Sequence, residues 1–148
     1  MKPIVTWIVA VDGARVRVFA NDGPGKGIRP VSGLNLEDAH LRARDINADK
    51  PGRTVTPAGQ RSAVEPRTDP VAHEEEIFVK MVADVLKLKK AAGAFDRLII
   101  AADPASLGTL RAALSGAVDK SVMAELPKDL TRIPLNEMPR HLGGMLAV

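Results

Sequence analysis

The sequence predicts an α/β domain in which a mixed β-sheet packs against helices. Three features lead to this prediction: a hairpin pattern over residues 4–20, a continuous apolar run at 98–102, and alternation of helix and strand patterns after residue 69. A hairpin followed by helix–strand alternation favours a sheet that contains both antiparallel and parallel pairs.

The length and composition predict one domain over residues 1–148. Domains usually contain about 100–150 residues, and a chain of this size buries roughly 68–70% of the surface that its unfolded form exposes. The sequence contains no Cys, which excludes disulfides and fits a reducing compartment. The net charge of +3 is only mildly basic. Aromatic residues are scarce, which disfavours base-stacking recognition of single-stranded RNA.

The first apolar stretch, residues 4–11, is interpreted as a strand. It is short and runs into Asp12-Gly13 with no small-residue cleavage pattern, unlike a signal peptide. No apolar run approaches the roughly 20 residues of a membrane span. We therefore expect a cytoplasmic protein that is neither exported nor inserted in a membrane.

The hairpin is predicted from Asp12-Gly13-Ala14, which separates strands at 4–11 and 15–20. Asp-Gly between apolar runs is a strong hairpin signal. Period-2 alternation places side chains of the second strand on two faces. One face carries Val16 and Val18, and the other carries Arg15, Arg17 and Phe19. A turn over 21–27 and a short third strand near 28–36 are expected to follow.

A long helix is predicted between Pro70 and Gly93. Asp69 suits the N-cap, proline suits the first turn, and glycine suits the end of a helix. Acidic residues 74–76 near its start and lysines near its end suit the helix dipole. The predicted apolar face consists of Ile77, Phe78, Met81, Val82, Val85 and Leu88.

The remaining pattern alternates strands and helices. The run 98–102 predicts a strand covered on both faces, and Asp103-Pro104 predicts a capped helix that Gly116 ends. Leu107, Leu110 and Leu114 form that helix's apolar face. A strand over 118–126, with Val122, Ala124 and Leu126 on one face, precedes a short helix near Leu135–Leu142 that Pro139 limits. The predicted order is β-β-(β)-loop-α-β-α-β-α, a layout that occurs in RNase H-like domains.

Residues 40–69 show no sustained periodicity and are rich in Pro and Gly. Loops of this length in compact domains are usually functional or disordered. The candidate nucleic-acid-binding residues in this segment are Arg42, Arg44, Arg53, Arg61 and Arg67. Acidic residues are mixed among them, which favours a solvated surface loop. Both interpretations stay open.

Several segments carry a family resemblance. They are the hairpin Trp7–Phe19, the helix that contains Phe78, the run Phe95–Ala101 with Pro104 and 107–111, and Glu125–Thr131. Their order and spacing resemble the bacterial host-attachment family, the "protein required for attachment to host cells", over nearly the whole chain. The resemblance implies the family's proposed role in adhesion to host cells.

The family is also distantly similar to the central domain of eukaryotic and archaeal class 1 peptide-chain release factors. In those proteins a loop with the sequence Gly-Gly-Gln enters the peptidyl-transferase centre. The corresponding segment here is 56–62, which contains Gly59 and Gln60, the alternative catalytic candidates. Ala58 stands in place of the first glycine, and because Ala adopts positive φ poorly this substitution argues against hydrolysis.

Other candidate sites have simpler structural interpretations. Asp12, Asp103 and Asp129 could form an RNase H-like carboxylate cluster, but turn, cap and loop roles explain them one by one. At Asp103-Pro104-Ala105-Ser106, capping is favoured over a ligand site at the end of a strand. His40, His73 and His141 lack ligand spacing, and Ser62 and Ser106 lie outside a G-x-S-x-G motif. The sequence therefore predicts no metal and no cofactor.

These observations favour a non-catalytic interaction domain with an unknown protein or ribonucleoprotein partner. The alternative is a ribosome- or tRNA-associated protein, similar to a release factor, that acts through residues 53–62. Direct adhesion at the cell surface is a third possibility. An enzymatic activity is not favoured, and the oligomeric state is left open.

Overall fold

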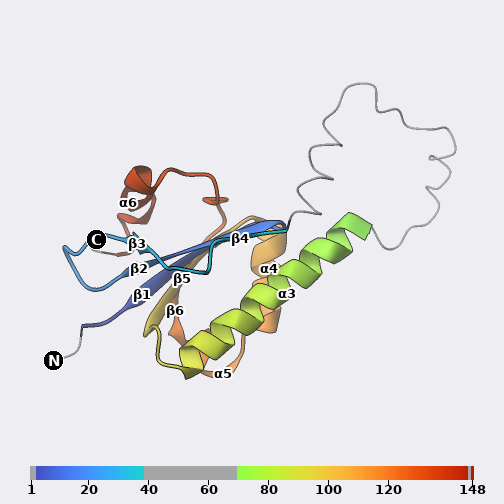
Figure 1. Cartoon of the computed structure of the whole chain (residues 1–148), viewed down its shortest axis with the longest axis horizontal. Helices are drawn as coiled ribbons and strands as arrows, with labels where there is room; N and C mark the ends of the chain where they lie inside the picture. Colours follow the sequence, from blue (N-terminus) through green and yellow to red (C-terminus); the bar gives the residue numbers. More distant parts are fainter. Residues whose placement is uncertain (1–2, 39–69, 147) are drawn as a thin grey trace, which may run out of the picture.

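The computed structural model describes residues 3–38, 70–146 and 148. Within them, one six-stranded mixed sheet lies between a layer of helices and a C-terminal segment (Figure 1). The strands are β1 (Thr6–Val11), β2 (Arg15–Asn21), β3 (Arg29–Pro30), β4 (Leu36–Glu37), β5 (Arg97–Ala102) and β6 (Val122–Leu126). The helices are α3 (Pro70–Ala91), α4 (Pro104–Ala113), α5 (Gly116–Ser121), the 3₁₀ turn η2 (Leu135–Glu137) and α6 (Met138–Leu142).

The strand order is β3-β2-β1-β5-β6, and β4 also pairs with β2. Strand β1 is antiparallel to β2 and parallel to β5, which is in turn parallel to β6. The predicted mixed sheet is therefore confirmed. One strand was predicted near residues 28–36, but the structure contains two short ones. Pro30 has no N–H to continue a ladder, and Gly33 turns the chain with a φ of 82°.

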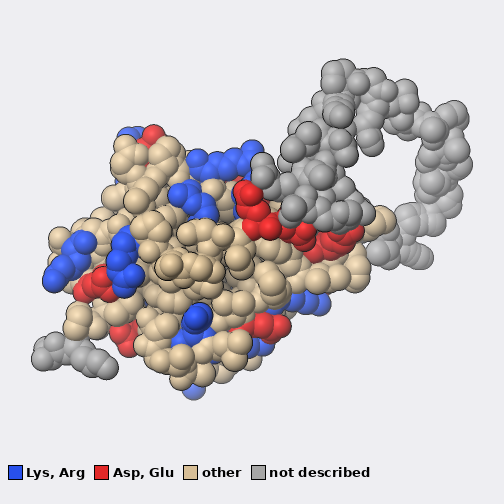
Figure 2. All heavy atoms as spheres, in the orientation of Figure 1, with Lys and Arg blue, Asp and Glu red and all other residues tan. Residues whose placement is uncertain are grey.

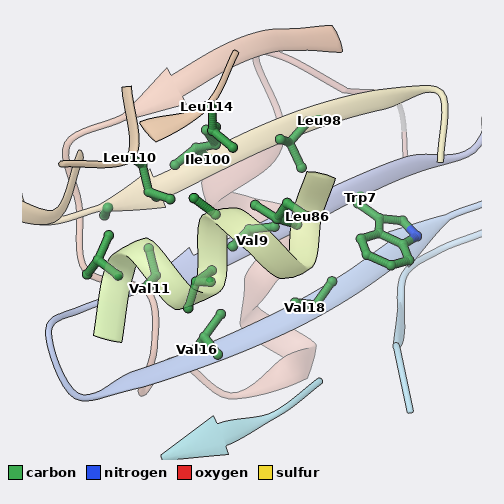
Figure 3. Close-up of a cluster of buried hydrophobic side chains, with 14 of the residues drawn as sticks. Trp7, Val9, Val11, Val16, Val18, Leu86, Leu98, Ile100, Leu110 and Leu114 are labelled. Carbon is green, nitrogen blue, oxygen red and sulfur yellow. The ribbon is translucent and has the colours of Figure 1, made fainter. Parts of the chain in front are cut away.

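Both faces of the central strands are buried. On the helix side, Val9, Val11, Leu98 and Ile100 pack with side chains of α3 and α4, including Leu86 (Figure 3). On the other side, a second buried cluster joins the sheet to the C-terminal segment. Its members are Ile8, Ala10, Phe19, Ile99, Ala101, Leu130, Met138 and Leu142. The prediction that 98–102 is a strand covered on both faces is confirmed.

Helix α3 begins at Pro70 as predicted and ends just before Gly93, whose φ is 78°. Asp69 lies outside the described residues. The predicted apolar face is partly wrong: Phe78 and Val82 are buried, whereas Ile77, Met81 and Leu88 are 54%, 38% and 71% exposed. The remaining buried residues of α3 are Val79, Ala83 and Leu86. The helix carries apolar residues around more than half of its circumference. Tertiary packing buries the side that includes Phe78, Val82 and Ala83.

Helix α4 has the predicted cap and the predicted core. The Ser106 N–H donates to Asp103 Oδ2 at 3.2 Å, and Leu107, Leu110 and Leu114 are buried. These contacts fix the helix immediately after β5. The cap satisfies one of the N–H groups that the first turn of a helix leaves without a partner.

The predicted strand over 118–126 is wrong in its first part. Residues Gly116–Ser121 form α5, which buries Val118 against the helix-side core, and β6 begins only at Val122. Gly116, the first residue of α5, has a φ of 61°, and α4 already ends at Ala113.

The strand β6 contains a bulge that the sequence pattern did not indicate. Val122 pairs with Leu98 and Ala124 with Ile99, so Met123 is an extra residue on β6. Val122 therefore packs in the helix-side core, while Ala124 and Leu126 pack on the other face. The prediction that all three share one face is wrong for Val122.

The C-terminal segment is anchored to the outer face of the sheet by Arg17 of β2. Its Nη1 donates to the carbonyl oxygens of Thr131 at 3.1 Å and Ile133 at 2.7 Å. The guanidinium also lies over the Phe19 ring, 4.8 Å from its centroid. The predicted final helix is present as η2 and α6, with Pro139 in its first turn.

We expect Arg17→Met to lower the free energy of unfolding by about 2 kcal/mol, because charged donors to backbone carbonyls contribute roughly 1.5–3 kcal/mol. Urea unfolding checks this value, and hydrogen exchange should accelerate between Leu130 and Leu142. The exposed Arg140→Met serves as the control and should change stability by less than about 0.5 kcal/mol. Equal effects of both variants would contradict the anchoring role.

We expect Asp103→Ala to lower stability by about 1 kcal/mol through loss of the α4 cap, whereas Asp103→Asn should have much less effect. Asparagine retains the side-chain oxygen that accepts from Ser106, so only the charge is removed. Thermal unfolding monitored by circular dichroism measures both variants. An asparagine variant as unstable as the alanine variant would show that the charge, not the cap, matters.

Candidate functional site

A cavity of about 530 Å³ lies at the carboxyl ends of β1 and β5. Pockets that hold small ligands or side chains usually measure about 300–1,000 Å³. Open α/β sheets commonly bind ligands outside the carboxyl ends of their strands. Its lining comes from the hairpin turn, from α3, from the start of α4 and from the segment after β6. The lining residues are Asp12, Gly13, Ala14, Arg15, Val71, Ala72, Glu75, Glu76, Val79, Asp103, Ala105, Ser106, Thr109, Asp129 and Arg132.

Asp12 organises the hairpin turn at the cavity wall. Its Oδ1 accepts from the N–H groups of Ala14 and Arg15 at 2.8 and 2.9 Å. Its Oδ2 accepts from Arg15 Nη1 at 2.9 Å. The predicted turn role is therefore confirmed, and the same bonds orient the carboxylate.

Thr131 links Asp12 to Asp129 across 117 positions of sequence. The Thr131 Oγ1 lies 3.1 Å from Asp12 Oδ2 and 2.5 Å from Asp129 Oδ1. The Thr131 N–H also donates to Asp129 Oδ1 at 2.9 Å. Thr131 is buried, and its single hydroxyl proton is shared by two carboxylates, which holds the segment after β6 against the hairpin turn.

Asp103 brings a third carboxylate to the cavity. Its Oδ2 caps α4, while its Oδ1 is buried and accepts no hydrogen bond from the described residues. A buried acceptor without a donor costs free energy. This oxygen has almost no solvent-accessible surface, so the cost belongs to the folded domain itself.

The turn and α3 approach each other closely beside the cavity. A Cβ atom placed on Gly13 would lie 2.6 Å from Cδ of Glu75. A side chain at position 13 would therefore displace the end of the flexible Glu75 side chain from its present place against the turn.

The cavity is predominantly acidic. Five of its lining residues are acidic, namely Asp12, Glu75, Glu76, Asp103 and Asp129, and two, Arg15 and Arg132, are basic. Arg15 is already paired with Asp12, and its Nε lies 3.6 Å from Glu37 Oε2. Figure 2 shows acidic side chains gathered over the first turns of α3. This electrostatic environment favours a cation and disfavours a phosphate.

The structure brings together three carboxylates that the sequence explained one by one. Asp12, Asp103 and Asp129 keep their turn, cap and loop roles, yet all three line the same cavity. Across the described residues, no group of three or more His, Asp or Glu side chains is arranged to hold a metal ion. The three therefore share a cavity without forming a metal cluster of the RNase H type.

The candidates of the long loop lie outside the described residues. They are Arg42, Arg44, Arg53, Arg61, Arg67, Gly59 and Gln60. The described residues that flank this stretch lie beside the cavity. The Asp38 N–H donates to the Ala14 carbonyl at 2.7 Å, and Val71, next to Pro70, lines the cavity wall.

Sequence reasoning missed Thr131 and the pairing of Gly13 with Glu75. The spacing Asp129-x-Thr131 was available, because an Asp side chain commonly accepts from the N–H two residues later. The contact of Thr131 with Asp12 had no signal in the sequence, since it depends on the path of the chain after β6.

In the part of the chain that the structure describes, no helix is long and apolar enough to cross a bilayer.

No curated protein matches the chain significantly. Among solved structures, the chain is similar to an archaeal translation termination factor, aRF1, with 11% sequence identity and a TM-score of 0.48. This similarity covers 95% of the present chain and 38% of that chain.

A family model described as "Protein required for attachment to host cells" matches residues 7–142, from β1 to the end of α6. The match includes the hairpin turn, α3, α4 and the segment with Asp129 and Thr131, which together form the cavity. The chain therefore belongs to the host-attachment family.

Proposed function

We propose that this chain is a non-catalytic interaction domain that binds a basic segment of a partner protein at the cavity. The observation that carries the proposal is the excess of carboxylates around a cavity at the carboxyl ends of β1 and β5. A lysine or arginine side chain is long enough to enter such a cavity and to donate charge-assisted hydrogen bonds to carboxylates.

The carboxylates are held in place before any partner binds. Asp12 is fixed by the turn and by Arg15, Asp129 by Thr131, and Asp103 by the first turn of α4. Binding a cation there would cost little side-chain entropy, because these rotamers are already ordered.

The same hydrogen bonds support a binding role over a catalytic one. A general base needs a carboxylate oxygen that is available to the substrate proton. Both oxygens of Asp12 accept protein hydrogen bonds, and Oδ1 of Asp129 accepts from Thr131. The unpartnered Oδ1 of Asp103 is buried away from solvent, so it is not open to a substrate proton. In this proposal the whole chain is a single domain that is located in the cytoplasm, and its partner lies in the same compartment. Any effect on adhesion is therefore indirect.

We expect the double variant Asp103→Asn, Asp129→Asn to bind a tetralysine peptide about fivefold more weakly than the native chain, since two charge pairs at a partly exposed site contribute about 1 kcal/mol. Asparagine keeps the oxygens that accept from Ser106 and Thr131, so the fold is preserved. NMR titration measures the affinity. The amides of Ala14, Ser106 and Thr109 should shift in the native chain.

The control is Asp119→Asn on α5, an exposed carboxylate far from the cavity lining. It should bind the peptide as the native chain does, and a tetraglutamate peptide should not bind. Peptide shifts confined to residues outside the cavity, or equal binding by the double variant, would contradict the proposal.

The second candidate function is a ribosome- or tRNA-associated role through residues 53–62. Its support is the sequence itself, in which Gly59-Gln60 lies among arginines in a segment that resembles the release-factor loop. This role uses cationic contacts with phosphates and is therefore distinguishable from the acidic cavity.

For this role we expect co-sedimentation with ribosomes that falls as salt rises and falls further with Arg53→Ala and Arg61→Ala, since each phosphate contact releases counterions. Arg140→Ala, in α6, is the matched control. Absence from ribosome fractions of growing and stressed cells removes this candidate. Peptidyl-tRNA hydrolysis that survives Gln60→Ala removes its catalytic form.

A further inference from the structure

Helix α3 carries a second apolar stripe that faces away from the core. Ile77, Met81 and Leu88 are 54%, 38% and 71% exposed, and Val85 between them is half-buried. Positions separated by three, four, seven or eight residues lie on one side of a helix, so these four side chains form a continuous line. None of them lines the cavity of the proposed function.

The stripe is more than the occasional exposed apolar residue. Three of the seven large hydrophobic residues that are exposed in the described part of the chain lie on this one line, over about 18 Å of helix. Figure 1 shows α3 lying along the outside of the helix layer, with α4 and α5 behind it. A row of this kind is typical of a surface that packs against another helix.

The charges beside the stripe indicate which helix it fits. In order along α3 they are Glu76, Lys80, Asp84 and Lys87, so their signs alternate. Within one chain, Lys80 Nζ lies 3.2 Å from Glu76 Oε2, and Lys87 Nζ lies 3.7 Å from Asp84 Oδ1. Reversing this order places Glu76 opposite Lys87 and Lys80 opposite Asp84. All four charges lie on the same flank of the stripe, and the same flanks meet only when two helices pack in antiparallel orientation. A copy of the same helix in that orientation is therefore complementary at all four positions.

We propose that the α3 stripe binds a second copy of this chain in an antiparallel arrangement across a two-fold axis. Ile77 of each copy then packs on Leu88 of the other, and Met81 packs near Val85. A two-fold interface is closed, because the same patch is used by both copies. The antiparallel orientation also sets the positive end of each helix dipole beside the negative end of the other.

The alternative occupants fit less well. Membrane-surface helices carry a polar face rich in Lys and Arg, whereas Glu76 and Asp84 interrupt the basic residues here. An interface made by one helix per copy is small beside the roughly 1,200–2,000 Å² of stable complexes, so the dimer should be weak. We expect a dissociation constant on the order of micromolar or above.

The oligomeric state of the full chain tests this surface. Sedimentation equilibrium is measured across a concentration range that brackets this dissociation constant, and the native chain should show a monomer–dimer equilibrium. The Met81→Asp variant should dimerise at least tenfold more weakly, because two aspartates would meet near the two-fold axis. The matched control is Leu135→Asp, which changes an equally exposed apolar residue on η2 and should dimerise as the native chain does. Lys80→Glu and Asp84→Lys should each weaken the dimer, and their combination should restore it.

Cross-linking tests the orientation. The chain has no Cys, so single cysteines can be introduced without background reaction. A mixture of Ile77→Cys and Leu88→Cys chains should form a covalent dimer on oxidation, while each variant alone should form little. A monomer across the whole concentration range, a dimer insensitive to Met81→Asp, or cross-linking of each variant only with itself would overturn the proposal. Loss of peptide binding at the cavity would not affect these readouts.

Discussion

The in-register parallel pairing of β1 with β5 is the constraint on which the rest of the structure depends. Val11 at the end of β1 pairs with Ala102 at the end of β5, so Asp12 and Asp103 leave the sheet side by side. Both strands are buried on both faces, and a shift of one residue would turn every apolar side chain to the wrong face. The burial of the two cores therefore fixes the position of the cavity as well as the sheet.

The C-terminal segment adds the third carboxylate, and it is held by hydrogen bonds as well as by buried apolar contacts such as that of Leu130. After β6 the chain crosses to the face of the sheet opposite the helices. There the Arg17 guanidinium donates to two backbone carbonyl oxygens of the C-terminal segment. This anchoring places Thr131 beside Asp12 and Asp129. The geometry of the cavity thus depends on hydrogen bonds between the C-terminal segment and the hairpin, which join residues far apart in sequence.

Helix α3 connects the two surfaces that the proposals concern. Its N-terminal turns supply Glu75 and Glu76 to the cavity, its buried side contacts the core, and its outer side presents the line from Ile77 to Leu88. An interaction domain that dimerised along this line would present two cavities to a partner. Two linked sites raise the effective concentration of the second contact, which compensates for weak single sites.

The sequence by itself determined the elements whose signals are local. The Asp-Gly hairpin, the doubly buried run Leu98–Ala102, the Asp103 cap and the ends of α3 were all predicted, because turn, burial and cap preferences act over a few residues. Only the tertiary structure decided which of two apolar sides of α3 is buried, that residues 118–121 are helical, and where the Met123 bulge lies. It alone brought Asp12, Asp103 and Asp129 to one cavity, because that meeting depends on strand register and on a chain crossing that no local pattern encodes.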